Sequence, residues 1–150
     1  MAARFHLQPL LELAQQRSED AAQTLQRLKQ VWQEAELKLS QLETYLDEYR
    51  MRLQESTQNG LAIDQWRDYQ TFIVKLEIAI KTQGEEIERC RLRWEQSQIE
   101  WQTREREAKA YGTLRVRHQS AEQAKELRQE QRQQDEFARN QHHRKNPPEG

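Results

Sequence analysis

Few residues of this chain have the types and spacing that catalysis or metal binding requires. The only glycines are Gly60, Gly84, Gly112 and Gly150. They stand far apart, so no glycine-rich loop can cradle a phosphate. His142 and His143 are adjacent, but without further ligands at metal-binding spacing we expect both to be solvated. No Ser/His/Asp or Cys/His set lies where a fold could enclose it as a catalytic site. The sequence therefore predicts no catalytic residue, no cofactor, no metal and no small-molecule substrate, so we do not expect an enzyme.

The composition of the 150 residues favours long helices. Hydrophobic residues make up 35% and charged residues 33% of the chain, which has only four glycines and three prolines. Folds with many strands need many turns, and ordinary globular domains are about 45–50% apolar. Glutamine, a good helix former, occurs 23 times. No apolar stretch approaches the ~20 residues that span a bilayer. We expect an all-α protein in the cytoplasm.

Charge and cysteine content narrow the possible partners. The 24 Lys and Arg residues nearly balance the 25 Asp and Glu residues, which leaves a formal net charge of −1. Balanced charge removes the broad attraction that drives non-specific nucleic-acid binding. The single cysteine, Cys90, cannot form an internal disulfide, and its place in the apolar pattern indicates a small buried thiol.

A strict heptad pattern begins at Leu7. Its positions are alternately four and three residues apart: Leu7, Leu11, Ala14, Ser18, Ala21, Leu25, Leu28, Trp32, Ala35, Leu39, Leu42, Leu46, Tyr49 and Leu53. Only Ser18 among them is polar. Such spacing keeps one apolar stripe facing a partner helix along its whole length. The pattern predicts a first helix over about residues 7–54, with Pro9 in its first turn.

Turn residues separate this pattern from a second one. Residues 55–61 contain Asn59 and Gly60, which tolerate the left-handed backbone at the end of a helix. The second pattern runs through Ala62, Trp66, Tyr69, Ile73, Leu76, Ile80, Gln83, Ile87, Cys90, Trp94, Ser97, Trp101, Arg104, Ala108 and Tyr111. Two stripes joined by a short loop must bury each other. We therefore expect an antiparallel two-helix coiled-coil hairpin, with a loop at 55–61 and a second helix over about 62–138.

The loop position indicates how the two stripes face each other. Centring the turn on residues 54–61 places Ala21 opposite Trp94, Ala35 opposite Ile80, and Ser18 opposite Ser97, so that small residues face large ones. A shift of one heptad, which pairs Ala14 with Ala108, is the alternative. All four tryptophans are expected in the seam as core residues, with Trp101, near the open end of the hairpin, as the one expected to be half exposed.

The stripe weakens after Tyr111. Residues 112–139 keep helix-forming residues but have only a thin apolar face, so we expect a protruding C-terminal helix, partly frayed because unpaired helices are marginal in water. A disordered tail is expected over 140–150. The whole chain is predicted to be one coiled-coil domain, and a monomer, because the hairpin satisfies its own seam.

Apolar residues outside the seam indicate a partner site. Tyr45 and Phe72 each precede a seam residue, and such flanking positions meet on one side of an antiparallel hairpin. The surface would also include Leu42, Tyr49 and Leu76, with Lys38 and Ala79 one heptad further along and Gln83 at its edge. Exposed aromatic surfaces often mark partner sites. The alternative is that Tyr45 and Phe72 only shield the seam.

Several segments resemble the flagellar export protein FliJ family. They are Phe5–Ala14, Tyr45–Tyr49, Trp66–Ile73, Leu76-Glu77, Ala79-Ile80 and Asp135–Ala138. The resemblance covers nearly the whole chain without large insertions. It implies an antiparallel coiled coil, similar in shape to the gamma stalk of the rotary ATP synthase, in the flagellum-specific type III secretion apparatus.

The resemblance also implies partners and a site. Family members sit in the ring of the export ATPase FliI, which FliH regulates, link it to the gate protein FlhA, and bind export chaperones. The implied location is the cytoplasmic face of the inner membrane, at the flagellar base. By position, the gate-contacting residues fall on Leu42, Tyr45, Tyr49, Phe72, Leu76 and Ala79. The roles of Lys38 and Gln83 stay open. The paired ends near Ala14 and Trp101, with the helix 114–138, would enter the ATPase ring.

Two other readings remain at this point. One is the stalk of a virulence-type secretion system, or a generic coiled-coil scaffold, although a scaffold needs no apolar side surface. The other is a nucleic-acid-binding helical hairpin like those of some tRNA synthetases. The nearest thing to a basic stripe contains Arg89, Arg91, Arg93, Arg104, Arg106 and Lys109. Glutamates interrupt it throughout, so we do not expect nucleic-acid binding.

Overall fold

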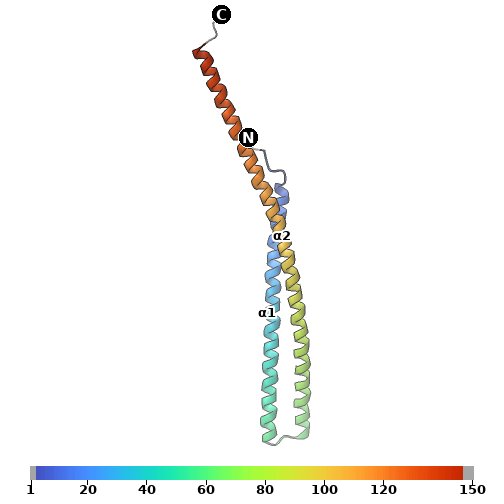
Figure 1. The fold of residues 1–150 in the computed structure, drawn as a ribbon. Helices are drawn as coiled ribbons and strands as arrows, with labels where there is room; N and C mark the ends of the chain where they lie inside the picture. The colour runs from blue at the N-terminus through green and yellow to red at the C-terminus, as the bar shows by residue number, and fades with distance from the viewer. Residues whose placement is uncertain (1–2, 147–150) are drawn as a thin grey trace. The chain divides into compact units, whose positions relative to one another are not determined.

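In the computed structural model, which describes residues 3–146, the chain forms two α-helices joined by a short loop (Figure 1). Helix α1 is Gln8–Gln58 and helix α2 is Ile63–Lys145, and no strand occurs between residues 3 and 146. The prediction of an all-α coiled-coil hairpin is confirmed.

The chain divides into two compact units. The hairpin unit is Glu19–Thr103, and the terminal unit contains the described residues up to Ser18 together with those from Arg104 onward. Within the hairpin unit, α1 and α2 run antiparallel on either side of the loop (Figure 1). That the chain acts as a single domain stays a prediction.

Helix α1 ends four residues later than the expected residue 54. Its last turn is held by the Thr57 hydroxyl, which donates to the Leu53 carbonyl at 2.7 Å, and by the Asn59 amide, which donates to the Glu55 carbonyl at 3.1 Å. Gly60 then adopts a φ of 84°, a left-handed conformation that glycine takes without strain. The loop is therefore confined to residues 59–62, shorter than the predicted 55–61.

Helix α2 also continues further than expected. The predicted tail began at residue 140, but α2 is helical to Lys145, and the Asn146 amide donates to the His142 carbonyl at 2.9 Å. No proline interrupts the sequence of α2 before Pro147, and the basic residues of the last turn favour the negative end of the helix dipole. The rest of the predicted tail, residues 147–150, lies outside the described residues.

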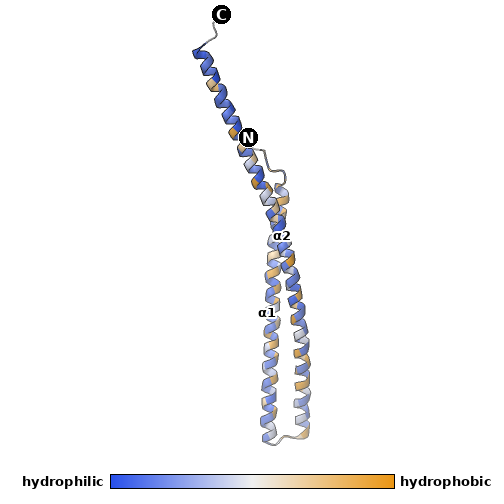
Figure 2. Ribbon diagram, in the orientation of Figure 1, coloured by the Kyte–Doolittle hydropathy of each residue, from blue (hydrophilic) through white to orange (hydrophobic). Residues whose placement is uncertain are grey.

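The core of the hairpin unit is a thin apolar seam. Its central cluster is Leu46, Ile73 and Leu76, with Leu42, Tyr49, Leu53 and Ile80 packed against it. Figure 2 shows hydrophobic residues recurring along both helices among a majority of hydrophilic ones. A pair of long helices has only this one interface to bury, which explains why so low a hydrophobic content is sufficient for the fold.

The register differs from the one centred on residues 54–61. In the hairpin unit Trp94 contacts Trp32, with ring centroids 5.5 Å apart, rather than Ala21, and Ala35 accepts a hydrogen bond from Gln83. In the terminal unit Ser18 meets Glu105, eight residues beyond the expected Ser97. Because α1 extends further than expected, the turn moves along the chain and every facing pair moves with it. The shift of about one heptad agrees with the alternative register.

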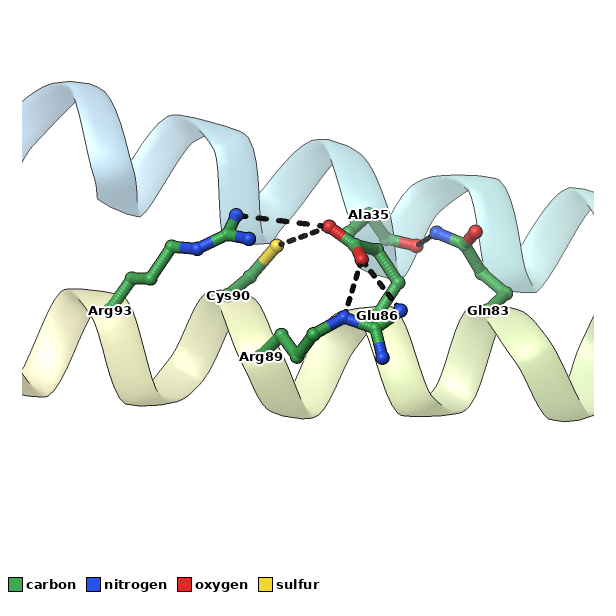
Figure 3. A network of polar contacts seen from close by, with 6 residues as sticks. All are labelled: Ala35, Gln83, Glu86, Arg89, Cys90 and Arg93. Atoms are coloured by element: carbon green, nitrogen blue, oxygen red, sulfur yellow. Dashed lines mark hydrogen bonds and ion pairs between the residues drawn. The ribbon is translucent and has the colours of Figure 1, made fainter.

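Polar residues occupy part of the seam (Figure 3). The Gln83 side-chain amide is buried and donates to the Ala35 carbonyl of α1 at 2.9 Å. Two helical turns further on, the buried Cys90 thiol donates to Glu86, at 3.6 Å from Sγ to Oε1, and Arg89 donates to the same carboxylate at 2.9 Å. Burial and, secondly, the hydrogen bond to Glu86 raise the pKa of the Cys90 thiol. The thiol is therefore a structural group, as predicted.

The terminal unit packs the beginning of α1 against α2. Leu11 and Ala14 are buried there, and the Ser18 hydroxyl donates to Glu105 at 2.6 Å. Ahead of α1, the Ala3 carbonyl lies 2.8 Å from Nε2 of His118. From residue 123 to residue 146 every side chain is exposed. This last part of α2 is a helix without tertiary packing.

A charge introduced into the seam should unfold the hairpin. We expect Leu46→Asp to lower the free energy of unfolding by roughly 3 kcal/mol or more, because it removes buried apolar surface and buries a carboxylate. The control is Leu37→Asp, at a position that is 59% exposed, where a change within about 0.5 kcal/mol is expected. Thermal melts followed by circular dichroism measure both, and equal melting temperatures for the two variants would contradict the seam.

Cys90 should react slowly with thiol reagents. Its burial and raised pKa keep it protonated and inaccessible, so a disulfide reagent should modify the folded chain at least about ten-fold more slowly than the chain in guanidinium chloride. The rate should still rise with pH above ~8.5, the ordinary pKa of a thiol. Because the chain has one cysteine, the signal comes from Cys90 alone. Rapid modification of the folded protein would show the thiol to be exposed.

Candidate partner-binding surface

Groups that could bind a metal or enter a bilayer are not assembled in the described part of the chain. Between residues 3 and 146 there is no group of three or more His, Cys, Asp or Glu side chains that could hold a metal ion. His142 and His143 stand with ring centroids 6.4 Å apart, exposed near the end of α2. Within the same residues, neither helix is long and apolar enough to cross a membrane. The candidate functional features are therefore surfaces.

The six residues predicted to contact a partner, which we call the aromatic surface, all lie in the hairpin unit. They are Leu42, Tyr45, Tyr49, Phe72, Leu76 and Ala79. Tyr45 is 55% exposed and Phe72 is 39% exposed. Leu76 is instead buried in the core cluster, with Leu42 and Tyr49 packed against it, and Ala79 is half-buried. The structure thus divides the set into accessible aromatic rings and the seam residues that support them.

Ring contacts hold part of the aromatic surface in place. The Phe72 ring packs on Tyr49, with centroids 4.3 Å apart and planes inclined by 43°. The Tyr69 ring also lies near the Tyr49 ring, with centroids 6.3 Å apart. Tilted aromatic pairs at these distances are favourable. Tyr49, anchored on the core, therefore fixes the position of Phe72, while Tyr45 is one helical turn before Tyr49 on α1.

Two predictions at the borders of this surface are changed by the structure. Gln83, predicted at its edge, is only 7% exposed, because its amide is engaged by Ala35 in the seam. It is unavailable to a partner, whereas Lys38 is exposed. Trp66, expected in the seam, is 46% exposed, because it lies one turn into α2, where the polar last turn of α1 offers little to cover it. Trp32, Trp94 and Trp101 are half-buried.

The sequence analysis missed a cavity beside the loop. Tyr49 and Phe72 line it together with Arg52, which follows Tyr49 by three residues on α1. The Arg52 guanidinium carbon lies 5.2 Å from the centroid of the Tyr49 ring. The signal was present in the spacing, because residues three apart on a helix are neighbours. Spacing alone does not show, however, that the guanidinium lies over the ring instead of pairing with a nearby glutamate.

Most basic residues in the middle of α2 are paired with glutamates of the same helix. Arg89 bonds Glu86 at 2.9 Å, and Arg91 bonds both Glu88 and, at 2.5 Å, Glu95. These arginine hydrogen bonds lower the pKa of the Glu86 and Glu88 carboxyls, so the pairs weaken as the pH falls through those lowered values.

Further along α2 the same pairing recurs in the terminal unit. Arg104 bonds Glu107 at 3.4 Å, and Lys109 lies 3.8 Å from Glu105. A stripe whose cations are already neutralised is a poor surface for phosphates. This arrangement argues against the reading as a nucleic-acid-binding hairpin.

Comparison with known proteins agrees with the hairpin. Among solved structures, a putative YscO homolog from Chlamydia trachomatis superimposes with a TM-score of 0.58 at 19% identity, over 96% of this chain and 99% of that chain. At that identity the likeness concerns the fold alone.

Sequence relatives carry the assignment further. The flagellar FliJ proteins of Salmonella typhi and Escherichia coli K12 are 33% and 32% identical, each over 92% of this chain and 94% of the relative. The family model described as "Flagellar FliJ protein" matches residues 3–147. A chain that matches this family over nearly its whole length, and folds as two packed helices, is a component of flagellar type III protein export and belongs to the flagellar FliJ family.

Proposed function

We propose that this chain is a non-enzymatic stalk that links the ring of the flagellar export ATPase FliI, regulated by FliH, to the export gate protein FlhA, and that receives export chaperones. The observation that carries the proposal is the pair of accessible rings of Tyr45 and Phe72 on a hairpin whose seam is already closed. Exposed aromatic residues that the fold does not need are typical of binding hot spots. The gate contact is assigned to this aromatic surface.

The ATPase contact is assigned to the terminal unit. The support is the segment 123–145, which is helical and exposed at every residue. A helix without packing is marginal in water, so it gains most from a partner that covers it. Leu127 and Phe137, each 65% exposed, offer apolar contacts there. ATP would be hydrolysed by the partner, and this chain would transmit the resulting displacement because bending a coiled coil disrupts its seam packing.

The remaining parts of the proposal follow from these two contacts. Binding to the gate would hold the chain at the cytoplasmic face of the inner membrane, at the flagellar base. A monomer is sufficient, because the two helices bury each other's apolar stripes. The alternative function, the stalk of a virulence-type secretion system, has only a likeness of fold in its favour, whereas the relatives of higher identity are flagellar.

Removing the exposed end of α2 should uncouple the chain from the ATPase. We expect the full chain to raise steady-state ATP hydrolysis by the flagellar export ATPase, and a chain that ends after Glu122 to lose most of this effect. The truncation removes only side chains without tertiary packing, so its melting temperature should match that of the full chain. Undiminished stimulation by the truncated chain would move the ATPase contact elsewhere.

Removing the two exposed rings should weaken binding to the gate. We expect Tyr45→Ala combined with Phe72→Ala to reduce affinity for the cytoplasmic domain of the gate protein about ten-fold or more, with helicity retained. The matched control combines Leu37→Ala with Ile78→Ala, which are 59% and 60% exposed but lie outside the aromatic surface. Titration calorimetry measures both. If the melting temperature of the ring variant is much lower than that of the control, Tyr45 and Phe72 only shield the seam.

A further inference from the structure

An open cavity of about 520 Å³ lies beside the loop of the hairpin unit. α1 contributes Tyr49, Arg52 and Ser56 to its lining, and α2 contributes Asp68, Tyr69 and Phe72. Two of these residues, Tyr49 and Phe72, belong to the aromatic surface. The cavity is therefore continuous with the surface assigned above to the gate contact, and it adds the charged groups of Arg52 and Asp68, which the aromatic surface lacks.

Arg52 is oriented towards this cavity although closer partners were available. Glu48 and Glu55 stand four residues before it and three after it, spacings at which Arg89, Arg91 and Arg104 form ion pairs in this chain. Arg52 instead places its guanidinium over the Tyr49 ring, 5.2 Å from the centroid. Among the described residues it has no carboxylate partner within ion-pair distance. A rigid, weakly hydrated cation thus remains unneutralised at the wall of a cavity.

The arrangement selects the charge of what can enter. An incoming cation would meet Arg52 on the face of Tyr49 that a cation–π contact would need, so the aromatic rings cannot act as a cation cage. A carboxylate is favoured, because a guanidinium offers it two parallel N–H donors. The rings of Tyr69 and Phe72 provide an apolar wall for the rest of the side chain. Asp68, from α2, would repel a carboxylate on its own side and so direct it towards α1.

We propose that Arg52 binds an acidic side chain of the gate protein, seated in the cavity against Tyr49 and Phe72. This proposal rests on the proposed function and specifies its gate contact: an aromatic surface that supplies apolar burial, with one arginine that supplies the charge match. The ion pair forms beside aromatic rings that exclude water, where a charge-assisted pair is stronger than on an open helix surface.

The test compares two arginines that are two residues apart. The full chain is titrated with the cytoplasmic domain of the gate protein, as wild type, Arg52→Gln, Arg52→Lys and Arg50→Gln. Arg50 is the control, because it is exposed and already paired with Glu77 at 3.1 Å. We expect Arg52→Gln to weaken binding roughly five-fold or more, Arg52→Lys to restore part of the loss, and Arg50→Gln to stay within about two-fold of wild type. Melting temperatures should be unchanged.

Two further measurements determine whether the group that enters the cavity is an anion or a cation. Asp68→Asn should leave binding unchanged or tighten it, and raising the salt concentration should weaken wild-type binding more than binding by Arg52→Gln. Weaker binding by Asp68→Asn with tighter binding by Arg52→Gln would mean that the cavity takes a cation, which overturns the proposal. Equal binding by wild type and Arg52→Gln would also overturn the proposal, provided that the double variant of Tyr45 and Phe72 still loses affinity. A wild-type chain that does not bind the gate domain overturns the proposed function, and this inference with it.

Discussion

The buried contact between the Gln83 amide and the backbone of the small residue Ala35 favours one register of the two helices. In a heptad seam, sliding one helix by seven residues returns apolar side chains to apolar positions, so hydrophobic burial alone discriminates weakly between registers. A buried amide is different, because it needs an accessible acceptor, and the small side chain of Ala35 leaves the backbone of α1 open to it. One heptad away on either side the facing residue is a leucine, Leu28 or Leu42, whose larger side chain would cover the carbonyl. Gln83 is 7% exposed and reaches the backbone of α1 at 2.9 Å. The contacts that build the aromatic surface depend on this register, since it brings Phe72 of α2 against Tyr49 of α1.

A hairpin of two helices has one interface, so its exposed residues have little part in stabilising the fold. Leu46, Ile73 and Leu76 form the central cluster of the hairpin core, and positions beyond the seam contribute little to folding. Large apolar side chains there raise the risk of association and give little stability in return. Tyr45, at 55% exposure, is such a residue. Phe72 is intermediate, because it shields Tyr49 while offering its own ring to solvent. The aromatic surface therefore contains both residues that stabilise the fold and residues that are available to a partner.

The two helices, the glycine at the turn and the buried thiol could all be predicted from the sequence, because periodicity and turn chemistry are local properties. The register could not, because the end of α1 was misplaced by four residues and a periodic seam tolerates the resulting shift. Trp66 fits the heptad pattern but is exposed, since periodicity does not reveal that the facing turn of α1 is polar. The extension of α2 to Lys145 was missed because a tail rich in charge was equated with disorder. Arg52 was missed for a different reason: its significance lies in the ring contact it makes in place of two available glutamates.

Charge pairing within α2 explains how a chain of net charge −1 can still be specific in what it binds. Neighbouring glutamates neutralise Arg89, Arg91 and Arg104. These stretches of α2 therefore exert little long-range electrostatic attraction. A surface of this kind gains selectivity from groups that are both unpaired and fixed in place. An arginine held on an aromatic ring meets both conditions, because its orientation is set before a partner arrives and less conformational entropy is lost on binding. Long-range electrostatic attraction would then matter less for the choice of partner than the fit of one cavity beside two rings.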